Sequence, residues 1–323
     1  MNTKNNALYW KSNSIIWPLL SVAVYAAALL IQVVLPTVQS VNVTYYRVFL
    51  GLAFVVQLVR YIVSRFLEQE RLVFNHKAQF YFAGGIVLIL WDLLSAKTAI
   101  LPLPFFPGPA QIAEVFATDY TTLFISTAYS LRLFFVGFLT GTVLGIVSGV
   151  LTGWLRQWEY WLSPVIKVTG IIPAVAWIPI AMAIFPNSFS TAVFLIAMCS
   201  WFPVSFMTAS GIAGVQKSYF EAARTLGASP SYLLWHVAIP GSLPSIFTGI
   251  STATGLSFGT LVVSEMIGAK AGLGWYINWA KGWSAYAKVY AAIIVMAIAF
   301  SIILAVINLI KKRLLLWQKG LVI

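Results

Sequence analysis

The stretch that decides the fold is Gly214 to Pro244, GVQKSYFEAARTLGASPSYLLWHVAIPGSLP, which lies between two long apolar runs. It is too polar to cross lipid, so it is expected to lie in water beside a membrane. Ser218 can cap a first short helix with Glu221 in its first turn, where a carboxylate suits the helix dipole. Gly227 supplies the positive-φ residue that ends this helix, and Ser229-Pro230 begins the next one. The stretch therefore predicts two short helices joined by a sharp turn.

The composition places most of the chain in a membrane. Of its 323 residues 60% are hydrophobic and 9% are charged, whereas a soluble domain carries roughly 25% charged residues. The formal net charge of +12 could indicate a nucleic-acid partner, but the basic residues flank apolar runs instead of forming a patch. Cys199 is the only cysteine and is expected to be a small buried hydrophobe. The sequence predicts an all-α integral membrane protein.

Eight apolar runs are long enough to span a bilayer. The first follows Lys4 and Lys11 and continues beyond its small-residue segment, so a retained helix is expected here and not a cleaved signal peptide. No soluble stretch is long enough to be a fused binding domain. The predicted spans are 15–35, 47–63, 79–94, 129–151, 165–185, 189–209, 245–267 and 289–310.

The loops between these spans carry unequal positive charge. The positive-inside rule therefore predicts that both termini and 214–244 are cytoplasmic, and that 97–127 and 268–288 are external. Residues near 111–116 are expected to form an amphipathic helix on the outer surface. The cytoplasmic side receives Lys4, Lys11, Arg65, Arg71, Lys77, Arg156, Lys217, Arg224, Lys311, Lys312, Arg313 and Lys319. The external side receives Lys97, Lys270, Lys281 and Lys288, with Arg47 at its edge.

Two spans have patterns that predict how they pack. In 129–151 and just beyond, glycine recurs at every fourth position, and such spacing permits close contact with another helix. These glycines are Gly137, Gly141, Gly145, Gly149 and Gly153. The span 165–185 is expected to be broken and to lie beside a cavity, because proline at membrane depth frees carbonyls that need partners. The residues that break it are Pro164, Gly170, Pro173 and Pro179.

The span 245–267 is unusually polar. Thr254, Ser257, Thr260 and Ser264 share one face, and their hydroxyls either bond back to the helix carbonyls or line a polar pathway. Glu265 adjoins this face, and a structural or gating role is favoured over direct substrate contact. Elsewhere, Asp92 and Arg132 are expected to be anchors at the membrane interface.

The 214–244 stretch resembles the EAA signature of ABC importer permeases. The resemblance is carried by Glu-Ala-Ala at 221–223, by Gly227 and by Val-Ala-Ile-Pro at 237–240. The alternative interpretation is an ordinary amphipathic connector. From Gln79 to Trp317 the chain also resembles the permeases of nitrate, sulfonate, taurine and bicarbonate importers, through Ser130-Leu-Arg132, Pro173-Ala-Val-Ala-Trp177-Ile-Pro179, Phe202-Pro203, Val263-Ser-Glu265-Met and Gly272-Leu-Gly274.

The resemblance implies a type I importer core of six helices in residues 79–323, preceded by a two-helix membrane extension in residues 1–78 that has no counterpart in the family core. It implies a bacterial inner-membrane protein that pairs with a second permease copy or paralogue and receives a small anionic solute from a binding protein. Two ATPase subunits would dock on Glu221, Ala222, Ala223, Leu226, Gly227 and Pro240. A translocation path or gate would use Pro173, Trp177, Pro179, Ser257, Thr260, Ser264 and Glu265.

Several motifs are missing from the sequence. There is no GxxxxGK[ST] loop, so ATP and Mg²⁺ are expected in the partner ATPase, with no cofactor in this chain. No metal or catalytic residues are assigned, because His76 and His236 are isolated and no nucleophile has a matching base. An ion-coupled secondary transporter is the alternative function, and it would need intramembrane acids and an inverted repeat. Glu265 is the one candidate acid, and no repeat is seen. A membrane-embedded enzyme is the third possibility.

Overall fold

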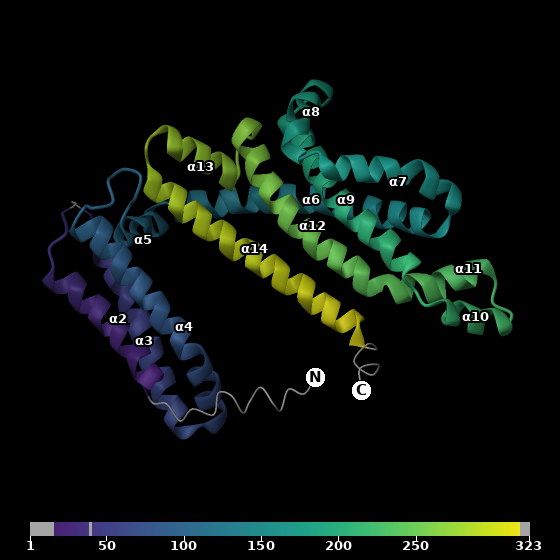
Figure 1. Ribbon diagram of the computed structural model, residues 1–323. Helices are drawn as coiled ribbons and strands as arrows, with labels where there is room; N and C mark the ends of the chain where they lie inside the picture. The colour runs from purple at the N-terminus through teal and green to yellow at the C-terminus, as the bar shows by residue number, and fades with distance from the viewer. Residues whose placement is uncertain (1–15, 39–40, 317–323) are drawn as a thin grey trace. The chain divides into compact units, whose positions relative to one another are not determined.

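The computed structural model describes residues 16–38 and 41–316, and every regular element in them is a helix (Figure 1). Seven helices of the described residues are long and apolar enough to cross a membrane, or eight if the bent pair Arg156–Ile171 and Ala174–Ile184 forms one span. The predicted all-α membrane fold is confirmed. The predictions that rest on Lys4, Lys11 and Lys319 fall outside the described residues.

Six of the seven long helices among the described residues are longer than the predicted spans. α6 has 35 residues where 129–151 was expected, because its first turns, although rich in hydroxyl groups, bury Leu123 and Ser126 and so gain packing. The α-helices are α2 (Ile16–Val34), α3 (Thr44–Phe66), α4 (Glu68–Asp92), α5 (Pro109–Thr118), α6 (Tyr120–Trp154), α7 (Arg156–Ile171), α8 (Ile178–Ile184), α9 (Ser188–Ala213), α10 (Lys217–Thr225), α11 (Pro230–Leu233), α12 (Ile239–Gly268), α13 (Leu273–Gly282) and α14 (Tyr286–Leu314).

The chain divides into two compact units. The first ends at Tyr120 and also includes Ala280–Ala291, and the second runs from Thr121 to Trp279 and resumes at Ala292. In the first unit, α2, α3 and α4 pack against one another around a buried apolar cluster that includes Val24, Tyr25 and Leu50. α4 begins at Glu68, so it passes without a break through residue 78, where the sequence suggests the extension ends.

A buried polar cluster joins three segments of the first unit. The Gln32 amide donates to the Asp92 carboxylate at 2.6 Å, and the Arg47 guanidinium donates to the Gln32 carbonyl at 2.9 Å. The Lys97 ammonium donates to the Leu35 carbonyl at 2.6 Å. Asp92 is only 2% exposed, and its place at the membrane interface stays a prediction. The bond from Gln32 satisfies Asp92 Oδ2, whereas Asp92 Oδ1 is buried without a hydrogen bond among the described residues.

The glycine stripe of α6 lies directly against α9 in the second unit. A Cβ atom built on Gly145 would approach the Val204 Cβ to 2.8 Å, and one on Gly149 would approach the Thr208 Cβ to 2.5 Å. Real side chains do not pack this closely, so the two backbones can lie together only because these positions lack a Cβ. The predicted close helix contact is confirmed. α12 packs against α9 as well, and residues of all three helices share one buried cluster.

The region 165–185 is a bent pair of helices and not one straight span. α7 ends at Ile171, a short 3-10 turn covers Ala174–Trp177, and α8 continues at an angle of 99° to α7. Pro173 lies at the bend, where its missing N–H removes a helical hydrogen bond. Pro164, by contrast, remains inside α7. The predicted break is confirmed, and it lies at Pro173.

Candidate functional site

The helix that carries the Glu-Ala-Ala sequence is α10, and none of its residues is buried. Tyr219 and Leu226 are large apolar side chains with 53% and 89% exposure. The predicted Ser218 cap is wrong, because Gln216 occupies the extended position before the helix and Ser218 already lies within it. Glu221 is therefore the fifth helical residue and lies beyond the first turn.

The turn after α10 has the predicted geometry. Gly227 has φ of +82°, and the Ala228 N–H donates to the Ala223 carbonyl at 3.1 Å, which satisfies one of the last carbonyls of the helix. The Ser229 hydroxyl then accepts from the Tyr232 N–H at 3.3 Å and caps α11. The two short helices and the sharp turn between them are as predicted.

This exposed segment is held firmly at both ends. The Phe220 ring of α10 lies 6.1 Å from the Trp154 ring at the end of α6. On the other side, α11 runs through a π-helical turn (Leu234–Ala238) into α12, so that Pro230–Gly268 is one helical stretch of 39 residues. Pro240 lies inside this stretch, directly after the π-helical turn. The segment is therefore in contact with α6 and continuous with α12.

At the far ends of these helices, Glu265 is the centre of a second cluster, which we call the Glu265 latch (Ser130, Glu265, Leu273 and Gly274). The Ser130 hydroxyl lies 2.7 and 2.9 Å from the two Glu265 carboxylate oxygens. The Gly274 N–H donates to the Glu265 carboxylate, and the Leu273 N–H donates to the Ser130 hydroxyl, each at 2.8 Å. Glu265 is 1% exposed. The latch thus joins α6, α12 and α13.

Two glycines let the chain close over this carboxylate. Gly272 has φ of +123°, and a Cβ there would lie 2.5 Å from the Glu265 Cδ. A Cβ on Gly274 would lie 2.7 Å from the Glu265 Cβ. Sequence reasoning assigned Glu265 but missed Ser130 as its partner, although both Ser130-Leu-Arg132 and Gly272-Leu-Gly274 had been singled out.

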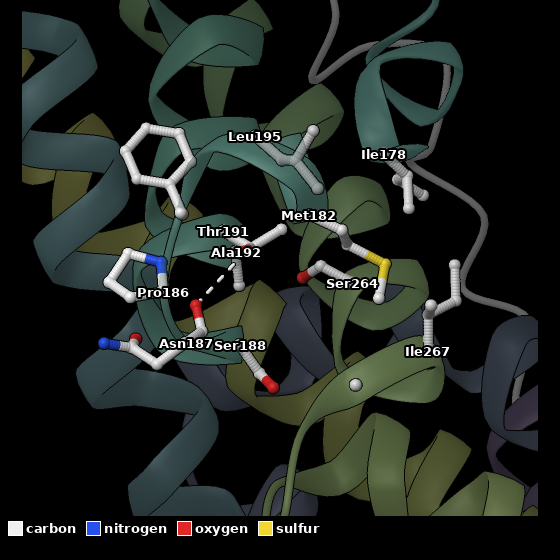
Figure 2. A pocket seen from close by; sticks show the side chains of 12 residues that line it. Ile178, Met182, Pro186, Asn187, Ser188, Thr191, Ala192, Leu195, Ser264 and Ile267 are labelled. Carbon is white, nitrogen blue, oxygen red and sulfur yellow. Dashed lines mark hydrogen bonds between the residues drawn. The ribbon is translucent and has the colours of Figure 1, made fainter. Parts of the chain in front are cut away.

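Four of the residues predicted to line a path adjoin one of two cavities. Pro173, Trp177 and Thr260 line one cavity of about 320 Å³, together with Cys199 and other residues of α9 and α12. Ser264 lines a second cavity of about 200 Å³. Figure 2 shows the Ser264, Met182 and Leu195 side chains around this second space. Their role in translocation stays a prediction.

The other path candidates have different surroundings. Glu265 borders a third cavity of about 630 Å³, but its carboxylate is bonded within the latch. Ser257 is fully buried, with its hydroxyl 3.5 Å from the Ile196 carbonyl of α9. Pro179 is exposed near the start of α8 and lines none of these three cavities.

The polar face of α12 uses its hydroxyls locally. Thr254, Thr260 and Ser264 each donate to a carbonyl three or four residues earlier, at 2.8 to 3.1 Å. Bonding back to the helix and lining a cavity therefore occur together at Thr260 and Ser264. In the part of the chain that the structure describes, no group of three His, Cys, Asp or Glu side chains could hold a metal ion.

The chain is similar to several permeases. It is 30% identical to the taurine transport system permease protein TauC of Escherichia coli (strain K12), covering 60% of this chain and 72% of that one. It is 36% identical to the putative aliphatic sulfonates transport permease protein SsuC of the same strain, covering 61% and 75%. It is 29% identical to the nitrate import permease protein NrtB of Synechococcus elongatus, covering 59% and 72%. These relatives confirm the branch that the sequence motifs indicated.

The fold has a known counterpart. A chain of the inward-facing MetNI methionine ABC transporter matches with a TM-score of 0.52 and 20% identity, covering 61% of this chain and 98% of that one. Residues 141–316, more than half of the chain, match the family described as "Binding-protein-dependent transport system inner membrane component". This range contains α10, the turn at Gly227 and Glu265. The chain therefore belongs to the family of binding-protein-dependent transport system inner membrane components, the permease subunits of ABC importers.

Proposed function

We propose that this chain forms, with a second permease copy or paralogue, the path by which an ATP-driven importer moves a small anionic solute. The exposed, anchored α10 segment carries the proposal, because it gives separate ATPase subunits a surface that is mechanically joined to α6 and α12. The relatives named for taurine, sulfonate and nitrate support an anionic solute. A binding protein would deliver it.

An ion-gradient mechanism has less support. It would need an intramembrane acid that is free to exchange a proton or bind a cation. Both Glu265 oxygens already accept hydrogen bonds from Ser130 or Gly274.

To test the proposed ATP-driven import, the full-length protein is purified from its own membrane, where we expect a P-loop ATPase to copurify. In vesicles, uptake of radiolabelled solute should need ATP and the binding protein. Uptake driven by an ion gradient alone would contradict the proposal.

We also propose that both termini and the α10 segment face the cytoplasm, and that α5 lies on the outer side of the inner membrane. The distribution of basic residues supports this orientation. In a Cys199→Ala background, Gln111→Cys should react with an impermeant maleimide in intact cells. Ser218→Cys should react only after permeabilisation. Labelling of both cysteines in intact cells would rule out this orientation.

A further inference from the structure

The largest of the three cavities has not been given a function. It measures about 630 Å³ and is lined by the ends of α6, α9 and α12 that lie away from α10. Its polar lining comes from three parts of the chain: Tyr129 and Arg132 of α6, Asn187, Ser188 and Ser190 at the start of α9, and Glu265 and Lys270 at and after the end of α12. One water molecule occupies about 30 Å³ of liquid, so the cavity has room for a small ion with several waters.

Two positive charges converge on this cavity. The Arg132 guanidinium lies over the Phe189 ring, 5.3 Å from its centroid, and this cation–π contact fixes its position at the cavity wall. Lys270, in the segment that follows α12, also lines the cavity and is exposed. Neither residue takes part in the two salt bridges found among the described residues, which are Arg71–Glu68 and Lys288–Asp119.

The single acidic residue in the lining is already engaged. Glu265 directs both carboxylate oxygens to the Ser130 hydroxyl and the Gly274 N–H, and it is 1% exposed. Ser188, at the first position of α9, places a hydroxyl in the same lining. The exposed polar groups of the cavity are therefore cations, hydroxyls and an amide. This set suits an oxyanion, which a guanidinium binds through paired N–H donors.

We propose that the Arg132–Lys270 cavity is a binding site for a small monovalent oxyanion, such as a sulfonate, nitrate or bicarbonate. The proposal rests on the proposed function, because it makes this cavity the first site in the permease that the released solute meets. It also gives Arg132 a role that differs from the interfacial anchor expected from sequence.

The charge of the cavity is tested without transport. Ser188→Cys is placed in the full-length Cys199→Ala protein, in phospholipid-free nonionic detergent. Its reaction rates with a sulfonate-bearing and a trimethylammonium-bearing methanethiosulfonate are compared with those of Thr122→Cys, an exposed position outside the cavity. The quantity compared is the rate with the sulfonate reagent divided by the rate with the trimethylammonium reagent. We expect this ratio to be about tenfold higher at Ser188→Cys than at Thr122→Cys, because a local potential near one kT acts oppositely on the two reagents. Arg132→Gln with Lys270→Gln should abolish this preference.

Occupancy is tested by protection. Methanesulfonate at constant ionic strength should slow modification of Ser188→Cys at least fivefold, with no effect at Thr122→Cys. Protection only after phospholipid is added would overturn the proposal, since the bound anion would then be a lipid headgroup. Equal rate ratios at the two cysteines would also overturn it.

The last measurement separates this proposal from the proposed function. In vesicles containing the complete transporter, Arg132→Gln with Lys270→Gln should lower anion uptake at least fivefold, while Lys281→Gln, a basic residue outside the cavity, should not. Uptake of only neutral or cationic solutes would refute the proposed function, whereas the thiol rates would still report the cavity. Normal anion uptake with unchanged thiol rates in the double variant would refute the cavity proposal alone.

Discussion

Gly227→Val should abolish transport, or leave ATP hydrolysis running without it, while the permease stays in the membrane at normal abundance. Gly227 has φ of +82°, a conformation that costs a β-branched residue about 1–3 kcal/mol. A Cβ built there meets nothing within 4 Å, so no clash inside the chain contributes. The strain would be relieved by distorting the turn, which sets how α10 and α11 are presented to the ATPase. Transport and ATPase activity of the reconstituted complex measure the effect.

The matched control is Gly227→Asn, because asparagine tolerates positive φ far better than valine. We expect Gly227→Asn to retain most transport, and Ser231→Ala, outside the signature, to be mild. If Asn and Val fail equally, the lost function comes from a side chain at the docking surface and not from backbone strain. Full coupled transport in Gly227→Val would mean that this segment is only a connector.

Glu221→Lys reverses a charge on the same α10 docking surface, and its effect is measured by the same transport and ATPase assays. Glu221 is exposed on α10. Charged side-chain pairs three or four residues apart on an exposed helix face contribute only about 0.2–0.5 kcal/mol to helix stability. Such a change cannot unfold the segment, so loss of transport would be due to the docking surface. Solute capture by the binding protein should be unchanged in Gly227→Val and in Glu221→Lys.

Local patterns were the features that sequence predicted best. The glycine stripe on α6 and the positive φ of Gly227 each follow from a short run of residues and from what a missing Cβ permits. The bend near Pro173 follows from a missing N–H. Each could be predicted because its physical cause lies within a few residues of the feature itself.

Long-range pairings could not be predicted in this way. Ser130 and Glu265 are 135 residues apart, and Gln32 and Asp92 are 60 apart, so no periodicity connects them. The burial of Asp92 against Gln32 could not be predicted, because a single sequence does not reveal the amide partner. Ser218 was expected to be a cap because serine favours that position, but the chain enters α10 two residues earlier, at Gln216.

Glu265→Ala should cause the largest loss of stability among single changes in the second unit. The substitution would leave the buried Ser130 hydroxyl and Gly274 N–H without their carboxylate acceptor. Each buried polar group that loses its partner costs about 1–3 kcal/mol. Because the latch joins α6, α12 and α13, these elements should separate at lower temperature. We expect a lower thermal midpoint in detergent, and little or no transport by the protein that remains folded.

Three further variants identify the cause. Glu265→Gln keeps one acceptor for the Gly274 N–H and should be milder than Glu265→Ala. Ser130→Ala removes the hydroxyl and leaves the Leu273 N–H unpaired, so it should also lower the midpoint. The double variant Ser130→Ala with Glu265→Gln should lower the midpoint by less than the sum of the two single changes, because both single changes disrupt the same contact. Gly272→Val would combine positive-φ strain with a clash against the Glu265 carboxylate.

A role of the latch in transport predicts an effect on ATP use that a purely structural role does not predict. If the latch holds α6, α12 and α13 together in one state of the transport cycle, weakening it should change ATP use as well as stability. Below the thermal midpoint, Ser130→Ala should therefore hydrolyse more ATP per solute imported than the unmodified complex. An unchanged ratio in folded Ser130→Ala, together with a lowered midpoint, would limit the latch to a structural role. A normal midpoint and normal transport in Glu265→Ala would exclude both roles, because a buried carboxylate with these partners could then be removed without consequence.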